Sequence, residues 1–143
     1  MKKILIPVLL STIAFSTPSM AAHPMCGKTE LAQIMDDMKD HMKAVKKAVK
    51  AGDMDKLGSI ADQLLAAVDN SYNLVPLAIS DKAELTEDQK GDFANYQKGM
   101  KYLKGAIEEL KAAKDMGEVK AALGKIGKSS KKGHKAFKMD CDA

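Results

Sequence analysis

The sequence predicts an all-α protein that folds as an antiparallel up-down-up-down four-helix bundle. Apolar residues recur every three or four positions in four separate segments, as they do along one face of a helix. Glycine, proline and helix-capping residues divide these segments from one another. No segment of useful length shows the alternation of apolar and polar residues that is typical of a strand.

The first helix is predicted to begin after Thr29, which can cap it, and to run to about Ala51 before Gly52. Its apolar positions are Leu31, Ile34, Met35, Met38, Met42, Val45 and Val49. Asp53 is the predicted cap of the second helix. The apolar stripe of that helix holds Leu57, Ile60, Leu64, Leu65 and Val68.

Residues 71–85, with Pro76 among them, interrupt the helical pattern and are predicted to form a long connection. Thr86 and Gln89 have the spacing of a capping box at the start of a third helix. The inner face of this helix carries Phe93, Tyr96, Met100, Leu103, Ile107 and Leu110. A fourth helix is expected after residues 114–117. Its core face is predicted to hold Val119, Leu123, Ile126, Ser130, His134, Phe137 and Cys141.

The first 21 residues have the pattern of an export signal. Two lysines precede an apolar run at 4–15, and Ser19 and Ala21 fit the small-residue rule for signal-peptidase cleavage. We therefore expect residues 1–21 to be a cleaved signal peptide and the mature protein to be periplasmic. The apolar run is too short to span a bilayer, so we expect no membrane insertion of the mature chain.

Residues 22–143 leave 122 of the 143 residues, enough for one domain with a core. Two of the 23 basic residues lie in the signal peptide, so 21 face 19 acidic residues and the mature net charge is +2. All of these basic residues are lysine. Because phosphate and base recognition favour arginine, we expect no nucleic-acid partner.

Cys26 and Cys141 lie near the two ends of the mature chain. In an up-down-up-down bundle the start of the first helix and the end of the fourth lie at the same end, so the two cysteines become neighbours. A disulfide is the expected outcome in an oxidising compartment. In the chain-entropy model, closing this loop would stabilise the folded state by roughly 4–5 kcal/mol. Two metal-binding thiolates are the alternative.

Met35 and His134 are predicted to face each other at one height in the bundle. Met35 lies about 9 Å along the first helix from Thr29, and His134 lies about 10 Å from Cys141. An imidazole and a thioether on opposite sides form a suitable axial pair for a haem iron, and with both positions filled the remaining chemistry is electron transfer. A core histidine with a hydrogen-bond partner and a methionine used only for packing remain the alternative.

Three segments resemble the soluble periplasmic cytochrome b562 family: MDDMKDHMKAVKKA (35–48), YQKGMKYLKGAI (96–107) and SKKGHKAF (130–137). The resemblance covers essentially the whole mature chain. It implies a four-helix-bundle haem-binding domain at 22–143, with Met35 and His134 as axial ligands of the iron. The residues expected to contact the haem are Met38, Tyr96, Met100, Leu103, Ser130 and Phe137.

The fourth helix also resembles that of the cytochrome c′ bundles, in which two cysteines precede the histidine as CxxCH. Ser130 and Gly133 stand at the equivalent positions, and neither can form a thioether bond. The resemblance therefore implies one non-covalent haem b per chain.

Six lysines surround the histidine: Lys125, Lys128, Lys131, Lys132, Lys135 and Lys138. They can form a solvated face that suits a helix C-terminus. Alternatively, they pair with haem propionates or steer an acidic redox partner towards an exposed haem edge.

Two other functions fit the same helices. A periplasmic copper-binding protein would use Met35, Met38, Met42 and His41, with His23 and Met25, as soft ligands for Cu(I). A structural bundle would hold no cofactor. The sequence carries no serine–histidine–carboxylate pattern and no Glu-x-x-His motif of di-iron bundles, so we expect the protein not to be an enzyme.

Overall fold

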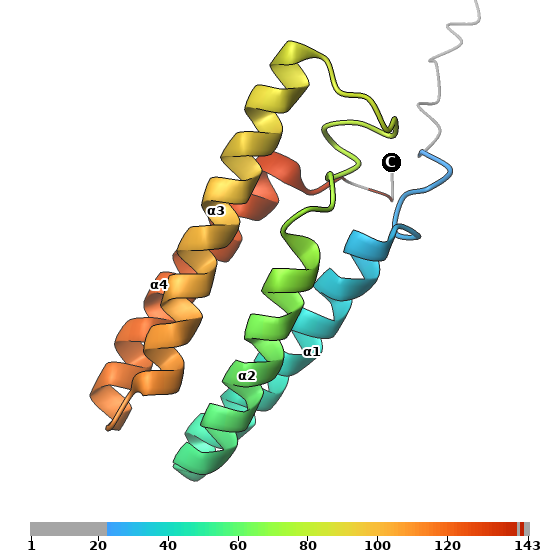
Figure 1. The fold of residues 1–143 in the computed structure, drawn as a ribbon. Coiled ribbons are helices and arrows are strands. Elements are labelled where there is room, and N and C mark those ends of the chain that lie inside the picture. The colour runs from blue at the N-terminus through green and yellow to red at the C-terminus, as the bar shows by residue number, and fades with distance from the viewer. Residues whose placement is uncertain (1–22, 140, 142–143) are drawn as a thin grey trace, which may run out of the picture.

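The computed structural model describes residues 23–139 and 141, and within them it contains four helices and no strand. These are α1 (Glu30–Ala51), α2 (Met54–Ser71), α3 (Glu87–Ala112) and α4 (Met116–Phe137). They alternate in direction, and α1–α2 and α3–α4 form two antiparallel hairpins (Figure 1). The predicted all-α four-helix bundle is confirmed. The predicted signal peptide lies outside the described residues.

The first three helices begin where the capping residues predict, whereas α4 begins at Met116, inside the predicted connection at 114–117, with Asp115 as its cap. The Thr29 hydroxyl accepts a hydrogen bond from the Ala32 amide at 3.1 Å, and the Asp53 carboxylate accepts one from the Lys56 amide at 2.9 Å. Thr86 and Gln89 form a reciprocal capping box at the start of α3. Gly52, with a φ of 68°, ends α1 in the left-handed conformation that glycine adopts without strain.

The end of α4 differs from the prediction. The apolar pattern extends the last helix to Cys141, but α4 ends at Phe137, and Lys138 has extended backbone dihedrals. Cys141, the last residue of the predicted face, therefore lies outside the helix. This departure from the helix brings Cys141 to Cys26, with their Cα atoms 5.6 Å apart in a disulfide. The disulfide expected from the shared end of the two cysteines is present in the structure, and the two-thiolate alternative does not apply.

The core is tight along its whole length on α2, which stays buried to its last residue Ser71, whereas α1 and α4 lose burial towards the disulfide. Near the two short connections, Val45, Leu57, Leu110 and Val119 are at most 2% exposed. Burying each such side chain contributes roughly 1.5–3 kcal/mol. Towards the disulfide the burial declines: α1 has no buried residue before Met38, and α4 has none after Ile126. The apolar stripes of these two helices therefore continue beyond the closed core.

Helix packing follows chain order. Close backbone contact joins α1 to α2, α2 to α3 and α3 to α4, whereas α1 and α4 share at most a marginal contact. The ion pairs between described helices, Lys104–Asp69, Lys111–Asp62 and Lys125–Glu109, also follow this order. The bundle is therefore open between its first and last helices. None of the four helices is long and apolar enough to cross a membrane.

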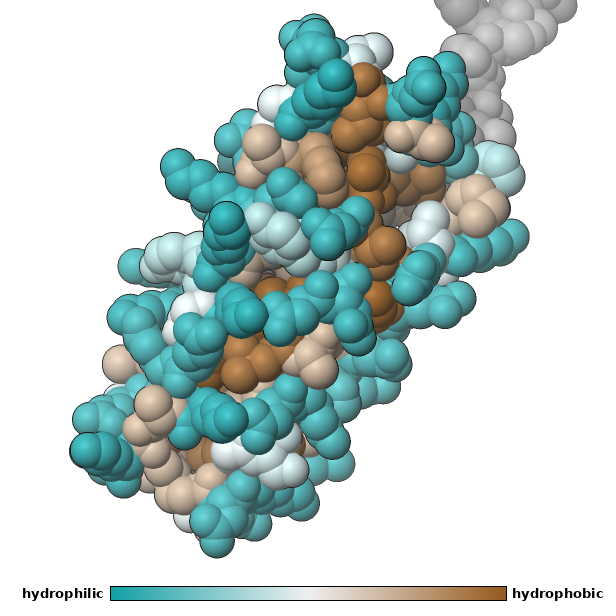
Figure 2. All heavy atoms as spheres, viewed as in Figure 1, coloured by the Kyte–Doolittle hydropathy of each residue, from teal (hydrophilic) through white to brown (hydrophobic). Residues whose placement is uncertain are grey.

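The connection between α2 and α3 covers the end of the bundle that carries the disulfide (Figure 1). Its apolar residues Leu74, Val75, Leu77 and Ile79 are half-buried. Figure 2 shows apolar surface gathered over this connection and along the seam between the two hairpins. Gln89 of α3 donates a hydrogen bond to the Ile79 carbonyl at 2.9 Å, which holds the connection against the start of that helix.

Candidate functional site

The thioether of Met35 lies on the part of α1 that extends beyond the closed core. Its side chain is half-buried and packs against the edge of the core cluster, as do those of Leu31 and Ile34. Met38, one turn further along α1, is 8% exposed and belongs to the core itself. Met35 is thus an apolar sulfur donor at the boundary between the closed core and the open face.

His134 is exposed, so the prediction that it lies buried in the core is wrong for this structure. His134 does lie along the apolar stripe of α4, but α1 does not cover this part of the stripe. Position on a stripe leads to burial only where a neighbouring helix covers the stripe, and α1 and α4 share at most a marginal contact. Among the described residues, His23 is the histidine whose side chain forms hydrogen bonds. The imidazole of His134 has no hydrogen-bond partner among these residues.

The direction of His134 on α4 follows from an ion pair nine residues earlier. Lys125 Nζ lies 2.6 Å from Glu109 Oε2, which places Lys125 on the flank of α4 that borders α3. Nine residues turn an α-helix by about two and a half revolutions, so His134 lies on the opposite flank. His134 therefore faces away from α3, towards the open side of the bundle on which α1 lies.

Gly133 leaves open space beside this histidine. It lies two turns after the buried Ile126, at a position where the stripe of α4 would be expected to carry a core side chain. It is half-buried, and no heavy atom comes within 4 Å of the place where a Cβ would stand. The backbone of α4 is therefore flanked by unfilled space at the height of His134.

An aromatic group on α3 and α4 forms one wall near this space. The rings of Tyr96 and Phe137 are 5.6 Å apart in an edge-to-face arrangement, and Phe93 stacks on Tyr96 at 5.9 Å. The Tyr96 hydroxyl donates a hydrogen bond to the Ser71 carbonyl at 2.9 Å. Burial raises the pKa of Tyr96 to about 12. The wall is thus fixed by packing and by one buried hydrogen bond to the end of α2.

The other residues predicted to contact a haem fall into two groups. Met100 and Leu103, like Met38 and Tyr96, are buried in the core cluster. Ser130 and Phe137 of α4 are half-buried on the part of the helix beyond Ile126. Met35 and His134 lie towards the same end of the bundle, but on the two helices that share at most a marginal contact. Their matched height and their roles as iron ligands stay predictions.

The lysines of α4 form a positive rim around His134. All six are exposed, and Lys125 alone is in an ion pair within the part of the chain that the structure describes. No acidic residue lies between Val119 and Met139. The positive potential of this segment is therefore not neutralised by its own helix.

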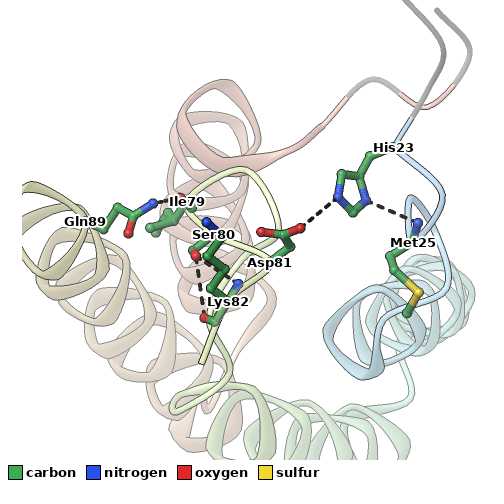
Figure 3. A network of polar contacts seen from close by, with 7 residues as sticks. All are labelled: His23, Met25, Ile79, Ser80, Asp81, Lys82 and Gln89. Carbon is green, nitrogen blue, oxygen red and sulfur yellow. Dashed lines mark hydrogen bonds and ion pairs between the residues drawn. The ribbon is translucent and has the colours of Figure 1, made fainter. Parts of the chain in front are cut away.

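His23 and Met25, proposed above as copper ligands, do not leave the imidazole open to a metal. His23 Nε2 lies 3.4 Å from Asp81 Oδ2, and its Nδ1 accepts a hydrogen bond from the Met25 amide at 3.2 Å (Figure 3). Both ring nitrogens are therefore engaged. Among the described residues, no group of three or more histidine, cysteine or acidic side chains could hold a metal ion.

Two surface hollows also lie away from His134. One of about 330 Å³ is lined by Met25 and Thr29 together with residues of the α2–α3 connection. Another of about 280 Å³ lies between α3 and α4 and is lined by Tyr102, Glu109 and Lys125 among others. Neither is lined by Met35 or His134, so neither belongs to the candidate site.

A four-helix bundle with sulfur and nitrogen donors on its first and last helices has the architecture of a bundle cytochrome. The family model for cytochrome b562 matches residues 30–138. The chain therefore belongs to the cytochrome b562 family, whose members are haem-binding electron carriers rather than enzymes. Comparison with the curated proteins and with the solved structures gave no match.

Sequence reasoning missed two features of the site. The hydrogen bond from Tyr96 to Ser71 joins residues 25 positions apart, and no local pattern indicates it. The open space beside Gly133 had a signal in the sequence, because the apolar stripe of α4 carries a glycine two turns after Ile126. A missing side chain on a core stripe is a sign of a hollow that other groups can fill.

Replacing Tyr96 with phenylalanine should destabilise the protein at pH 7 by about 1 kcal/mol, because the Ser71 carbonyl loses the hydrogen bond from the phenol and keeps the one from the Leu74 amide. The folded-state pKa of about 12 lies above the ordinary value of 10.0. The stabilisation linked to Tyr96 is therefore complete below pH 10 and declines as the pH rises towards 12. The difference between wild type and Tyr96→Phe should accordingly shrink over that interval.

Urea unfolding at pH 7 and between pH 10 and 12 measures both effects. Tyr102→Phe is the matched control, because Tyr102 is 57% exposed. A stability difference that stays constant up to pH 12 would contradict the buried-phenol interpretation.

Proposed function

We propose that the protein is a periplasmic b-type cytochrome that transfers single electrons through one non-covalently bound haem, with Met35 and His134 as axial ligands. One observation carries the proposal. In a chain of the cytochrome b562 family, the two helices that bear these donors, α1 and α4, share at most a marginal backbone contact. The disulfide supports the proposed location, because structural disulfides persist in oxidising compartments such as the periplasm.

The residues at the open face fit a haem in chemistry and in space. Met35 offers a soft thioether from the edge of the core, and His134 offers an imidazole with no partner among the described side chains. The space beside Gly133 gives room for a flat group along α4, and Phe137 and Tyr96 supply an apolar wall. Ser130 and Gly133 lack the thiols of a covalent attachment, so ligation and packing alone would hold the group.

A bound haem supplies a one-electron couple between ferric and ferrous iron. Met35 and His134 would fill both axial positions, which leaves no open position for oxygen. The neutral sulfur of Met35 favours the reduced ion and raises the reduction potential. The apolar residues around it would keep water from the iron, and the lysines of α4 would be candidates to pair with the propionates.

Haemin added to the purified protein should saturate at one equivalent and give a low-spin ferrous spectrum after reduction with dithionite. Removal of either axial donor, in His134→Ala or Met35→Ala, should weaken haemin binding by roughly tenfold or more, about 1.4 kcal/mol. Both variants should lose the six-coordinate low-spin signature.

His41→Ala and Met25→Ala are the matched controls, since they remove the same chemical groups elsewhere and should bind haemin as wild type does. They also test the copper alternative, which uses these residues. Absence of a low-spin spectrum at stoichiometric haemin would sink the cytochrome proposal, and full folding with no thermal shift upon adding haemin would favour the cofactor-free bundle.

A leucine in place of Gly133 should fill the space beside His134. We expect haemin affinity to fall by about tenfold, because the side chain competes for the same volume. The thermal midpoint of the haem-free protein should rise, because a glycine inside a helix costs about 1 kcal/mol relative to good helix formers. Haemin titration and thermal unfolding of the same variant measure the two opposite effects.

Gly124→Leu provides the comparison. Gly124 lies on α4 about half a turn round from Gly133 and is exposed, so its replacement gains helix propensity without filling the core. It should stabilise the protein and leave haemin binding unchanged. Equal haemin affinity in the two glycine variants would show that the space beside Gly133 does not serve the cofactor.

We further propose that the positive rim of α4 receives an acidic redox partner. Exposed lysines without ion pairs steer anions most strongly at low ionic strength. Reduction of the haem-loaded protein by an anionic iron complex should therefore slow steeply as salt is added. A variant with four lysines replaced by glutamine should show a flatter salt dependence; the replaced residues are Lys128, Lys131, Lys132 and Lys135.

The control removes the same charge at the far end of the bundle. Its four lysine-to-glutamine replacements are at Lys46, Lys47, Lys50 and Lys56, all exposed around the α1–α2 turn. The salt dependence of this control should match that of wild type. An equal change in both variants would show that net charge, and not the α4 rim, controls the rate.

A further inference from the structure

The disulfide joins the two helices that carry the proposed iron ligands. Cys26 lies four residues before the start of α1, and Cys141 lies four residues after the end of α4. Their Cα atoms are 5.6 Å apart although 115 positions separate them in sequence. Met35 lies nine residues after Cys26, and His134 lies seven residues before Cys141. The crosslink is thus anchored within a few helical turns of both donors.

Other described interactions hold α1 and α4 to different neighbours. The aromatic pair Tyr96–Phe137 fixes the end of α4 against α3. The His23–Asp81 pair ties the segment before α1 to the α2–α3 connection (Figure 3). The ion pairs of α1 are internal to that helix, namely Lys39–Asp36 and Lys43–Asp40. No described ion pair or side-chain hydrogen bond links α1 to α4.

We infer that Cys26–Cys141 is a positioning element of the haem site, which sets the separation between the ends of α1 and α4 and so the distance between Met35 and His134. The inference rests on the proposed function. Beyond Met38 and Ile126 the apolar side chains of α1 and α4 are only partly buried, and Phe137 packs on Tyr96 of α3, so neither helix end is held to the other by a described side-chain hydrogen bond or ion pair. The disulfide is the direct connection found there.

Restraint of this kind affects binding through preorganisation. With the crosslink intact, the ends of α1 and α4 are held together before haem binds, and ligation does not have to order them. Without it, each binding event must bring α1 and α4 together, and haem held mainly by one helix loses its second axial bond more readily. Because a thioether favours the reduced ion, loss of the Met35 bond also lowers the reduction potential.

The test compares wild type with the double variant Cys26→Ser/Cys141→Ser, since a single replacement would leave a reactive free thiol. Both proteins are studied at a temperature at which circular dichroism shows them fully folded. We expect haemin to bind the double variant about tenfold more weakly. Its ferric spectrum should show a larger five-coordinate high-spin fraction, and its reduction potential should be lower than that of wild type.

Val68→Ala separates positioning from general stability. Val68 is 2% exposed on α2, and its truncation weakens the core without altering the link between α1 and α4. This variant should bind haemin with the affinity and low-spin spectrum of wild type at the same temperature. A Cys26→Ser/Cys141→Ser protein with unchanged affinity, spectrum and potential would overturn the positioning role alone. Failure of wild type to bind haemin would instead overturn the proposed function.

Discussion

Close backbone packing in this bundle joins the helices in chain order, and a disulfide links the segments that flank α1 and α4 at the end where the burial of these two helices declines. An apolar stripe that is not covered by a neighbouring helix exposes surface to water, which is unfavourable in proportion to its area. The stripes of α1 and α4 continue past the closed core towards the disulfide. This arrangement makes that end of the molecule suited to receive an apolar group.

The open end combines properties that a haem requires and a packed core lacks. A thioether lies at the edge of the core, an imidazole has no hydrogen-bond partner among the described residues, and a half-buried glycine precedes that imidazole on α4. Aromatic rings of α3 and α4 support one side of this space. The lysine rim gives the same region a positive charge that the rest of α4 does not cancel, so binding and partner recognition would involve a single end of the bundle.

The cytochrome b562 family explains why these features occur together, and the structure shows how the chain divides its stability between two ends. The end with short connections holds the tightest packing, with Val45, Leu57 and Val119 almost fully buried. That packing can keep the bundle folded while the other end stays adaptable. The disulfide and the His23–Asp81 pair restrain the adaptable end without filling it.

The sequence by itself determined the four helices, their caps at Thr29, Asp53 and Thr86, and the meeting of the two cysteines. These depend on contacts three or four residues apart and on the alternation of helix direction, both of which a linear pattern records. Only the tertiary structure decided that His134 is exposed and that Tyr96 bonds to Ser71. Burial depends on the distance to a neighbouring helix, and a residue's position on its own helix does not specify that distance.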